Sequence, residues 1–463
     1  DSTWKAQPSP VTESDIFDGE QYDARITRTV PAPDQAAGVK PIDLDTTRLE
    51  ARRSLPVCIN EEIRPVAVLR TPAGETVLDM GQNMTGWLRF KTSAPAGTRI
   101  HLQFGEVLQE GNFFRDNLRT AKAEYTYIAD GTEAVVEPFF AFFGFRYVKI
   151  SGWVDDLNLD DFTGCVVYSK MDTIGEIETS NAKVNQLIKN AMWSQKDNFL
   201  DIPTDCPQRD ERLGWTGDIQ VFSGTACFNM DVAAFLSKFA YDLAKEQTKT
   251  GGMVPHIVPM VNLDKGGSAA WADVATILPW NLYEFYGDIA ILDQQFESMR
   301  AWVDTIKAVD DSSGGKRLWT EGTHFGDWLS LDPPLYPDPR RGGTPHDFIA
   351  SAFYCYSARL VAKAANLLGK TNHAEAYGRL SAEVKTAIQQ EYFTATGRLA
   401  IPTQTAYVLA LFMDLVSDAH RARVENDFIA RLTQDDNHLR TGFVGTPYLC
   451  RVLSNIGAND LAY

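Results

Sequence analysis

The sequence predicts a β-sandwich followed by a domain built of helices alone. Between about residues 66 and 168, short apolar runs and polar–apolar alternation recur with glycine turns between them, a pattern typical of strands packed in two sheets. After about Met171 the apolar residues take helical spacing and the strand pattern nearly disappears. The chain has 463 residues, which exceeds what one hydrophobic core usually supports, so two or three domains are expected.

Residues 1–55 show little periodicity of either kind. Prolines interrupt this segment, at Pro8, Pro10, Pro31, Pro33 and Pro41. We interpret it as the remnant of a preceding domain together with a linker.

The predicted sandwich covers residues 56–170. Residues 99–104 alternate between polar and apolar side chains, as expected for a strand with one buried face. The aromatic run from Phe139 to Val148 is predicted to form the centre of its core.

The predicted helical domain covers residues 171–463. Val184, Leu187, Ile188, Ala191 and Met192 recur at the spacing of an amphipathic helix. The same pattern places further helices near residues 214–228, 231–246, 270–286, 288–308, 346–368, 372–392, 402–416, 418–432 and 445–456. A helical domain of this size suits a closed ring of helical hairpins better than a four-helix bundle.

Residues 203–218 carry the strongest functional signal. Four carboxylates, two arginines and a tryptophan lie between two prolines and two glycines, which fix a non-helical backbone path. Paired carboxylates in different environments are what glycosidic bond cleavage needs, one as a protonated acid and one ionised. A surface loop held by arginine–carboxylate pairs is the alternative.

Composition excludes several classes of function. The formal net charge is −17 with no long basic run, which argues against nucleic acid and anionic membranes and suits a neutral ligand such as a sugar. The seven histidines lack metal-site spacing, and Gly369-Lys370-Thr371 is interpreted as a helix cap rather than a phosphate loop, so neither metal nor cofactor is expected. Six widely spaced cysteines favour a cytoplasmic protein, with the periplasm or secretion as alternatives.

Residues 205–218 resemble the hallmark segment of the bacterial and fungal α-L-rhamnosidases of glycoside hydrolase family 78. The likeness continues, in family order, through residues 77–87, 117–123, 144–148, 326–329 and 442–449. It implies a remnant of a jelly-roll domain, a β-sandwich, and an (α/α)6 barrel of the six-hairpin glycosidase type that holds the active site.

The resemblance also implies roles for individual residues. Glu211 would be the general acid of an inverting hydrolysis of terminal α-L-rhamnosides. The sugar would be held by Asp205, Arg209 and Asp218 at its hydroxyls and by Trp215, Trp271 and Trp328 at its apolar faces. A general acid working near neutral pH needs a raised pKa, which Asp205 and Asp218 could supply by like-charge repulsion.

Other residues of these segments are expected to be structural. Asp210 and Arg212 are expected to form an ion pair, Cys206 to be a packed thiol, and Asp327 to support Trp328. The alternative for Trp271 and Trp328 is a structural role as tryptophans of the barrel core.

The pattern departs from the family at the C-terminus. About ten helices precede Tyr463, whereas an (α/α)6 barrel has twelve, and the expected general base lies beyond this residue. The chain alone is therefore expected to be inactive, with Glu321 and Asp327 the first residues to examine for a base if it is active. The alternatives are a non-catalytic rhamnoside-binding protein or another (α/α)6-barrel enzyme that acts on carbohydrates; a homodimer is left open.

Overall fold

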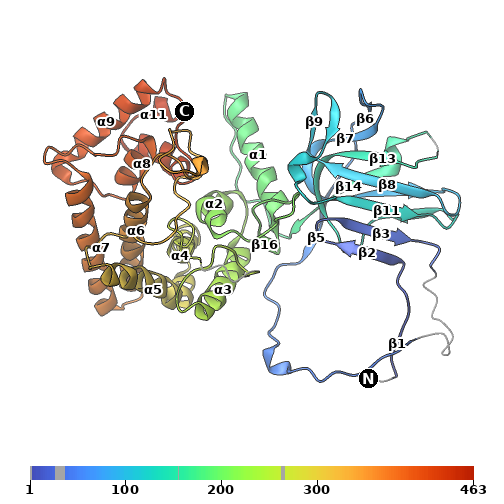
Figure 1. Ribbon diagram of the computed structural model, residues 1–463, viewed down its shortest axis with the longest axis horizontal. Coiled ribbons are helices and arrows are strands. Elements are labelled where there is room, and N and C mark those ends of the chain that lie inside the picture. Colours follow the sequence, from blue (N-terminus) through green and yellow to red (C-terminus); the bar gives the residue numbers. More distant parts are fainter. Residues whose placement is uncertain (1–2, 27–36, 155, 262–265) are drawn as a thin grey trace. The chain divides into compact units, whose positions relative to one another are not determined.

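The computed structural model describes residues 3–26, 37–154, 156–261 and 266–463 (Figure 1). Pro31 and Pro33 lie outside the described residues. The chain divides into two compact units. The β unit comprises Asp1–Asp172 and Glu176–Leu213, and the helical unit comprises Thr173–Gly175 and Gly214–Tyr463. The predicted domain limits of 1–55, 56–170 and 171–463 stay predictions.

The β unit is built on a ten-stranded sheet in which most neighbours are antiparallel. Its strands follow the order β2 (Val11–Asp15), β3 (Gly19–Asp23), β11 (Glu124–Ile128), β8 (Arg99–Gly105), β13 (Phe143–Ser151), β7 (Thr76–Thr92), β14 (Phe162–Ser169) and β5 (Val57–Ile63), with β6 (Ala67–Arg70) and β12 (Ala134–Val136) also paired to β7. The strand-rich texture predicted between residues 66 and 168 is confirmed.

Two of these strands lie in the segment expected to be a domain remnant and linker. β3 pairs in parallel with β11, and β2 pairs with β3, so residues 11–23 belong to the sheet. Each strand has five residues, and most of their side chains are at least partly exposed, so they carry too little apolar periodicity to be recognised.

The long strand β7 organises this sheet because it pairs with four others along its 17 residues. Gly86 lies where the backbone of β14 approaches closely. A Cβ at this position would lie 1.8 Å from the Cys165 carbonyl oxygen, so only glycine fits there.

The core of the β unit differs in part from the prediction. Phe143, Phe145 and Val148 on β13 are fully buried, whereas Phe139 and Phe140 are 52% and 73% exposed. The prediction is wrong for these two residues because they precede the strand, so strand alternation does not turn them inward.

The helices are confirmed at the predicted places. The first, α1 (Ala182–Asn198), belongs to the β unit. The helical unit contains α2 (Thr216–Asn229), α3 (Ala233–Lys249), α4 (Val274–Tyr286), α5 (Ile289–Ser312), α6 (His346–Leu367), α7 (Thr371–Tyr392), α8 (Gln404–Phe412), α9 (Arg421–Gln434), α10 (Thr446–Asn455) and the short α11 (Asn459–Ala462).

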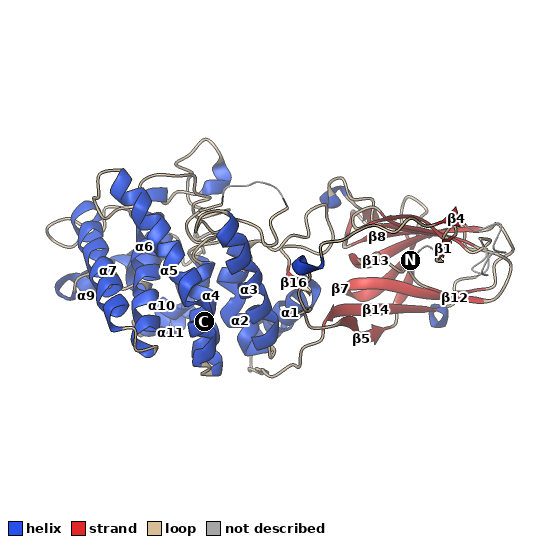
Figure 2. Cartoon of the chain, turned by 90° about the horizontal axis from the view of Figure 1, so that it is seen from below, coloured by secondary structure: helices blue, strands red, loops and turns tan. Residues whose placement is uncertain are grey.

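Two layers of helices make up the helical unit. Helices α2, α4, α6, α8 and α10 each contact the next in this series and form an inner layer, and Figure 2 shows α4 to α7 packed side by side. Eight consecutive residues of α8 are buried, whereas α7 and α9 bury one face only. Gln220 on α2 donates a hydrogen bond to the Tyr448 hydroxyl on α10, which joins the first and last helices of the inner layer.

All six cysteines belong to the described residues and are free thiols. Among the described helices, none combines the length and the apolar character needed to cross a membrane.

Candidate functional site

The acidic segment between Pro203 and Leu213 forms a closed loop in the β unit. The Asp205 amide donates to the Leu213 carbonyl over 2.9 Å, and the Leu213 amide donates to Asp205 Oδ1 over 2.8 Å. These two bonds cross-link the ends of the loop, so the side chains between them are held on a fixed backbone.

Arg212 anchors this loop to the rest of the β unit. Its buried guanidinium donates to four backbone carbonyls, those of Ile16, Phe142, Gln208 and Arg209. Burial lowers the pKa of Arg212 to about 10, so the group is still charged at neutral pH. The predicted Asp210–Arg212 ion pair is wrong, because Arg212 turns to backbone oxygens and Asp210 binds Arg119 instead.

Asp205, Arg209 and Glu211 form a compact acidic cluster. Arg209 donates to Asp205 Oδ2 over 3.1 Å and to Glu211 Oε2 over 3.0 Å, so one guanidinium bridges both carboxylates. The Asp205 side chain is 6% exposed and that of Glu211 is 20% exposed. Glu211 is therefore the more accessible of the two carboxylates.

A residue that sequence reasoning did not select completes the cluster. Arg119 donates to Glu211 Oε2 and forms a 2.8 Å ion pair with Asp210, while Thr120 also donates to Asp210. Arg119 lies inside one of the segments that resemble the family, and that likeness was the only signal for it.

The pKa of Glu211 differs from the prediction. Burial alone would raise it, but hydrogen bonds from Arg119 and Arg209 outweigh burial and hold the pKa of Glu211 below its usual value. The expected rise is wrong for this conformation because two guanidinium groups, rather than like charges, dominate its surroundings. Burial raises the pKa of Asp205, although the Leu213 amide opposes this.

Cys206 has the surroundings of a packed thiol. It is 3% exposed, and burial raises the pKa of its thiol to about 12, so it carries no thiolate at neutral pH.

One group in the described part of the chain has the composition of a metal site: Asp205, Cys206 and Glu211 place one ligand atom each within 4.8 Å of one another. Arg209 and Arg119 already bind these carboxylates, and the Cys206 thiol is protonated. The arrangement therefore suits hydrogen bonding to a polar ligand better than coordination of a cation.

The predicted tryptophans lie in an aromatic cluster of the helical unit. Phe325 is its centre, with ring centroids 4.8 Å from Trp271, 4.9 Å from His256, 5.9 Å from Trp328 and 6.0 Å from Trp215. Sequence reasoning missed both Phe325 and His256, because a single aromatic residue outside a periodic pattern gives no signal of what it packs against. The cluster supplies the apolar surface on which a sugar ring can stack.

Trp271 is the most buried tryptophan of this cluster, at 4% exposure. It stacks on Phe443 at 5.0 Å and presses against the first turn of α2. A Cβ at Gly217 would lie 2.4 Å from Trp271 Nε1, so this turn needs glycine for the indole to fit.

Trp328 is half-buried and lies beneath the guanidinium of Arg340, 4.9 Å from the ring centroid. Its neighbour Asp327 is completely buried and accepts four hydrogen bonds, from Thr405 Oγ1 and from the amides of Gly442, Val444 and Gly445. Glu321 is exposed.

Asp218 lies in the first turn of α2, where the helix dipole favours a negative charge. The structure thus brings Asp205, Arg209 and Glu211 together in the β unit. It brings Trp215, Trp271 and Trp328 together in the helical unit, with Asp218 on α2.

The β unit also holds a cavity away from these residues. It has a volume of about 690 Å³ and is lined by Tyr22, Tyr127 and Phe139 among others. None of the predicted site residues lines it.

Comparison with known proteins identifies both parts of the chain. The profile of the bacterial alpha-L-rhamnosidase concanavalin-like domain matches residues 69–168, and that of the bacterial alpha-L-rhamnosidase 6 hairpin glycosidase domain matches residues 172–463. The predicted β-sandwich followed by a six-hairpin glycosidase domain is thereby confirmed.

Curated relatives match this chain over nearly its whole length. An alpha-L-rhamnosidase of Streptomyces avermitilis is 38% identical over 468 residues, 99% of this chain and 44% of the relative, and one of Formosa agariphila is 36% identical over 100% of this chain and 50% of the relative. The chain thus spans about half the length of the curated relatives it matches.

Solved structures show the same fold. The Streptomyces avermitilis alpha-L-rhamnosidase complexed with L-rhamnose matches with a TM-score of 0.93 and 36% identity, over 100% of this chain and 44% of that one. An alpha-L-rhamnosidase from Aspergillus terreus matches with a TM-score of 0.94 and 34% identity, over 100% and 54%. With a domain profile that alone spans residues 172–463, the chain belongs to the bacterial alpha-L-rhamnosidase family.

Proposed function

We propose that this protein hydrolyses terminal α-L-rhamnosides, with Glu211 as the general acid. The observation that carries the proposal is a pair of carboxylates on one cross-linked loop that differ in exposure. Asp205 is buried, Glu211 is more accessible, and Arg209 bridges the two. The relative from Streptomyces avermitilis, whose fold matches over the whole chain, was solved in complex with L-rhamnose.

In the proposed reaction, Glu211 gives its proton to the glycosidic oxygen while the bond from this oxygen to C1 breaks. Water adds to C1 from the opposite face of the ring and loses a proton to a general base, which gives inversion. The base has no assignment in this chain.

Glu211 must be protonated before this step, and Arg119 and Arg209 oppose protonation. The proposal therefore includes release of Arg119 as substrate binds. The Arg119 side chain is 50% exposed, and Asp210 offers it a second partner, so the guanidinium can leave Glu211 without losing every ion pair.

Recognition of the sugar is proposed to use both charged and aromatic side chains. Asp205, Arg209 and Asp218 would bind hydroxyl groups, and Trp215, Trp271 and Trp328 would contact the apolar faces and the methyl group of a 6-deoxy sugar. Charged hydrogen bonds give orientation, while aromatic rings give contact area. The homodimer left open by the sequence stays a prediction.

One observation favours a second candidate, a rhamnoside-binding protein without turnover. With two arginines bound, Glu211 is an ionised acceptor, which suits binding of hydroxyl groups better than proton donation.

An aryl α-L-rhamnoside with a poor leaving group distinguishes the two candidates. Hydrolysis by the parent that falls about 10²–10⁴-fold in Glu211→Gln supports the general acid. Calorimetric titration with L-rhamnose checks that the variant still binds. Binding without hydrolysis in the parent supports the second candidate, and hydrolysis that survives in Glu211→Gln within about tenfold removes Glu211 from the acid role.

A further inference from the structure

Asp327 holds two separate loops together. Each of its carboxylate oxygens accepts two hydrogen bonds. Oδ2 accepts from Thr405 Oγ1 at 2.5 Å and the Gly442 amide at 2.8 Å, and Oδ1 accepts from the amides of Val444 at 2.9 Å and Gly445 at 3.1 Å. The residue is fully buried, so no water reaches these oxygens.

The two loops held in this way carry rings of the aromatic cluster. Trp328 follows Asp327 directly, and its carbonyl accepts the Phe443 amide over 2.8 Å. Phe443 stacks on Trp271, and Trp328 packs edge-on against Phe325. A Cβ at Gly442 would lie 2.5 Å from the Trp328 carbonyl oxygen, so the two backbones touch.

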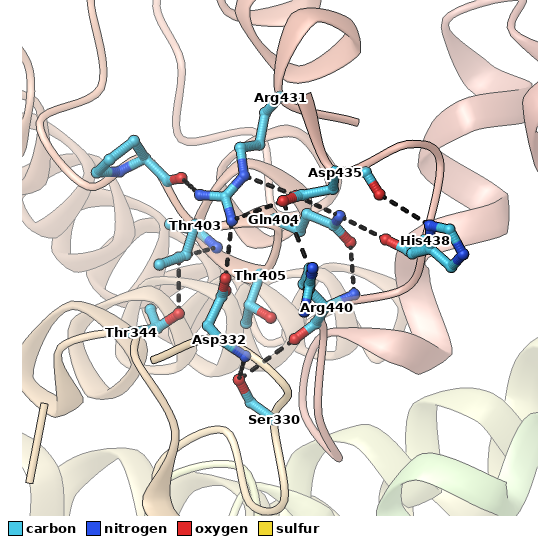
Figure 3. Close-up of polar contacts among 12 residues, drawn as sticks. Ser330, Asp332, Thr344, Thr403, Gln404, Thr405, Arg431, Asp435, His438 and Arg440 are labelled. Carbon is cyan, nitrogen blue, oxygen red and sulfur yellow. Dashed lines mark hydrogen bonds and ion pairs between the residues drawn. The ribbon is translucent and has the colours of Figure 1, made fainter. Parts of the chain in front are cut away.

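A second set of polar contacts, centred on Arg431, holds the same two loops at Asp332 and Asp435 (Figure 3). Arg431 donates to Asp332 Oδ1 over 2.8 Å and to Asp435 over 2.7 Å, and Gln404 donates to Asp435 and accepts the Arg440 amide. The Arg440 carbonyl in turn accepts the Leu331 amide over 3.0 Å. Figure 3 shows Asp332 and Asp435 approached by the Arg431 side chain.

These contacts leave Asp327 with one available role. Four donors and complete burial exclude it as a base that activates water, because such a base needs a free oxygen within reach of a water molecule. The donors are three backbone amides and one hydroxyl, so the group serves as a carboxylate that orients a loop.

We infer that Asp327 is a positioning residue, which fixes Trp328 and Phe443 so that the aromatic cluster keeps the shape needed to bind an apolar sugar face. The inference rests on the proposed function for the nature of the ligand. The contact between the loops does not depend on any activity, so the positioning role of Asp327 and the proposed function can be tested separately.

The test is Asp327→Asn in the full-length enzyme, with two readouts. In this variant a side-chain NH₂ group replaces one carboxylate oxygen of Asp327. The NH₂ group cannot accept hydrogen bonds, so two of the four donors lose their acceptor. Hydrogen exchange at the amides of Gly442, Val444 and Gly445 should become faster by about tenfold or more. KM for an aryl α-L-rhamnoside should rise about 5- to 50-fold while kcat stays within about threefold, because ring contacts act alike on substrate and transition state.

Two further variants make the test decisive. Thr405→Val removes one donor to Asp327 and keeps the side-chain volume. It should raise KM by about 2- to 5-fold and leave kcat nearly unchanged, and it can be measured even if Asp327→Asn fails to fold. Asp310→Asn changes another buried aspartate of the helical unit, one that binds Arg317 and the Tyr354 hydroxyl, and should leave KM unchanged.

A fall in kcat of about 100-fold or more at unchanged KM would make Asp327 a catalytic base and overturn the inference. Unchanged exchange in both variants would overturn it as well. A parent without rhamnosidase activity would contradict the proposed function, while the exchange measurement would still decide the role of Asp327 in the loops.

Discussion

The guanidinium of Arg119 donates a hydrogen bond to the carboxylate of Glu211, across 92 residues of sequence. Arg119 holds a backbone φ of +60° with ψ of −113°, outside the regions that a non-glycine residue usually adopts. Such a conformation costs about 1–3 kcal/mol and persists only where neighbouring contacts hold it. Its side chain contacts Asp210 and Glu211, and its backbone amide donates to the Asp116 carbonyl, so the strained residue joins a short 3-10 helix to the acidic cluster.

Arg119→Ala is expected to raise the pKa of Glu211, because it removes one of the two cations that lower it. The acid form then persists to higher pH, so the alkaline limb of the pH profile of kcat/KM should move towards higher pH. Each pH unit of that movement would multiply the rate on the alkaline limb by about ten. The measurement is kcat/KM for an aryl α-L-rhamnoside as a function of pH.

Arg119→Lys is the matched control. Lysine keeps the positive charge but lacks the planar guanidinium that binds two carboxylates at once. Its pH profile of kcat/KM should therefore lie between those of the parent and Arg119→Ala. A profile that falls uniformly at every pH without moving would show that Arg119 binds substrate rather than tuning Glu211.

Asp218→Ala is expected to raise KM and lower kcat together, because hydroxyl contacts strengthen as the sugar distorts towards the transition state. Loss of a hydrogen bond to a charged group predicts a fall in kcat/KM of about 10- to 100-fold. Steady-state kinetics with an aryl α-L-rhamnoside measures both constants.

Asp218 also lies in the first turn of α2, where its charge alone is worth about 0.3–1 kcal/mol of stability. Asp288→Ala removes the N-cap carboxylate of α5 and calibrates this purely structural effect. If Asp218→Ala merely lowers the melting temperature, as Asp288→Ala should, the residue has no part in recognition.

The sequence predicted the elements well because their signal is local. Helices α3, α5, α7 and α9 each have an apolar face at regular spacing, and the caps at Gly287 and Gly369 end helices where expected. What it could not predict are relations between distant segments. Nothing near Glu211 reveals that Arg119 reaches it or that Arg209 bridges it to Asp205, and so the direction of its pKa was predicted wrongly.

The same limit applies to Phe325 and Phe139. Phe325 stands outside any periodic run, yet four aromatic rings meet it. Phe139 belongs to an aromatic run that is indistinguishable from a core strand until the start of β13 at Phe143 is known. Apolar character is a local property, whereas burial is set by the whole fold.

Arg212→Ala is expected to lower the free energy of unfolding of the β unit by about 3 kcal/mol or more, because several carbonyls lose a donor and each unsatisfied buried group costs about 1–3 kcal/mol. The substitution removes a donor from four partly buried carbonyls, those of Ile16, Phe142, Gln208 and Arg209. The Arg209 carbonyl keeps the Glu211 amide as a second donor, so the loss is greatest at the other three. Urea denaturation followed by circular dichroism measures the loss. Arg423→Ala, which breaks an exposed pair with Asp427, is the control and should cost less than about 1 kcal/mol. Equal costs for the two variants would show that Arg212 does not anchor the acidic loop.

Gly217→Ala is expected to displace Trp271, because the new methyl carbon would lie 2.4 Å from its indole nitrogen and within 2.6 Å of two ring carbons. The indole cannot retreat freely, since it is 4% exposed and packed between Phe325 and Phe443. Overpacking of this kind costs about 1–3 kcal/mol. Thermal denaturation should therefore show a lower melting temperature, and calorimetric titration with L-rhamnose should show weaker binding.

Gly224→Ala supplies the control within the same helix. At Gly224 the nearest atom to a new Cβ is a ring carbon of Phe285 at 3.9 Å, an ordinary contact. Alanine there should stabilise α2 by about 0.4–1 kcal/mol, because it restricts the unfolded chain without any clash. Two opposite shifts from the same substitution, seven residues apart on one helix, would isolate the effect of the Trp271 contact from that of helix propensity. If Gly217→Ala also stabilises the protein and leaves rhamnose binding unchanged, the close approach of Trp271 to α2 does not determine the shape of the aromatic cluster.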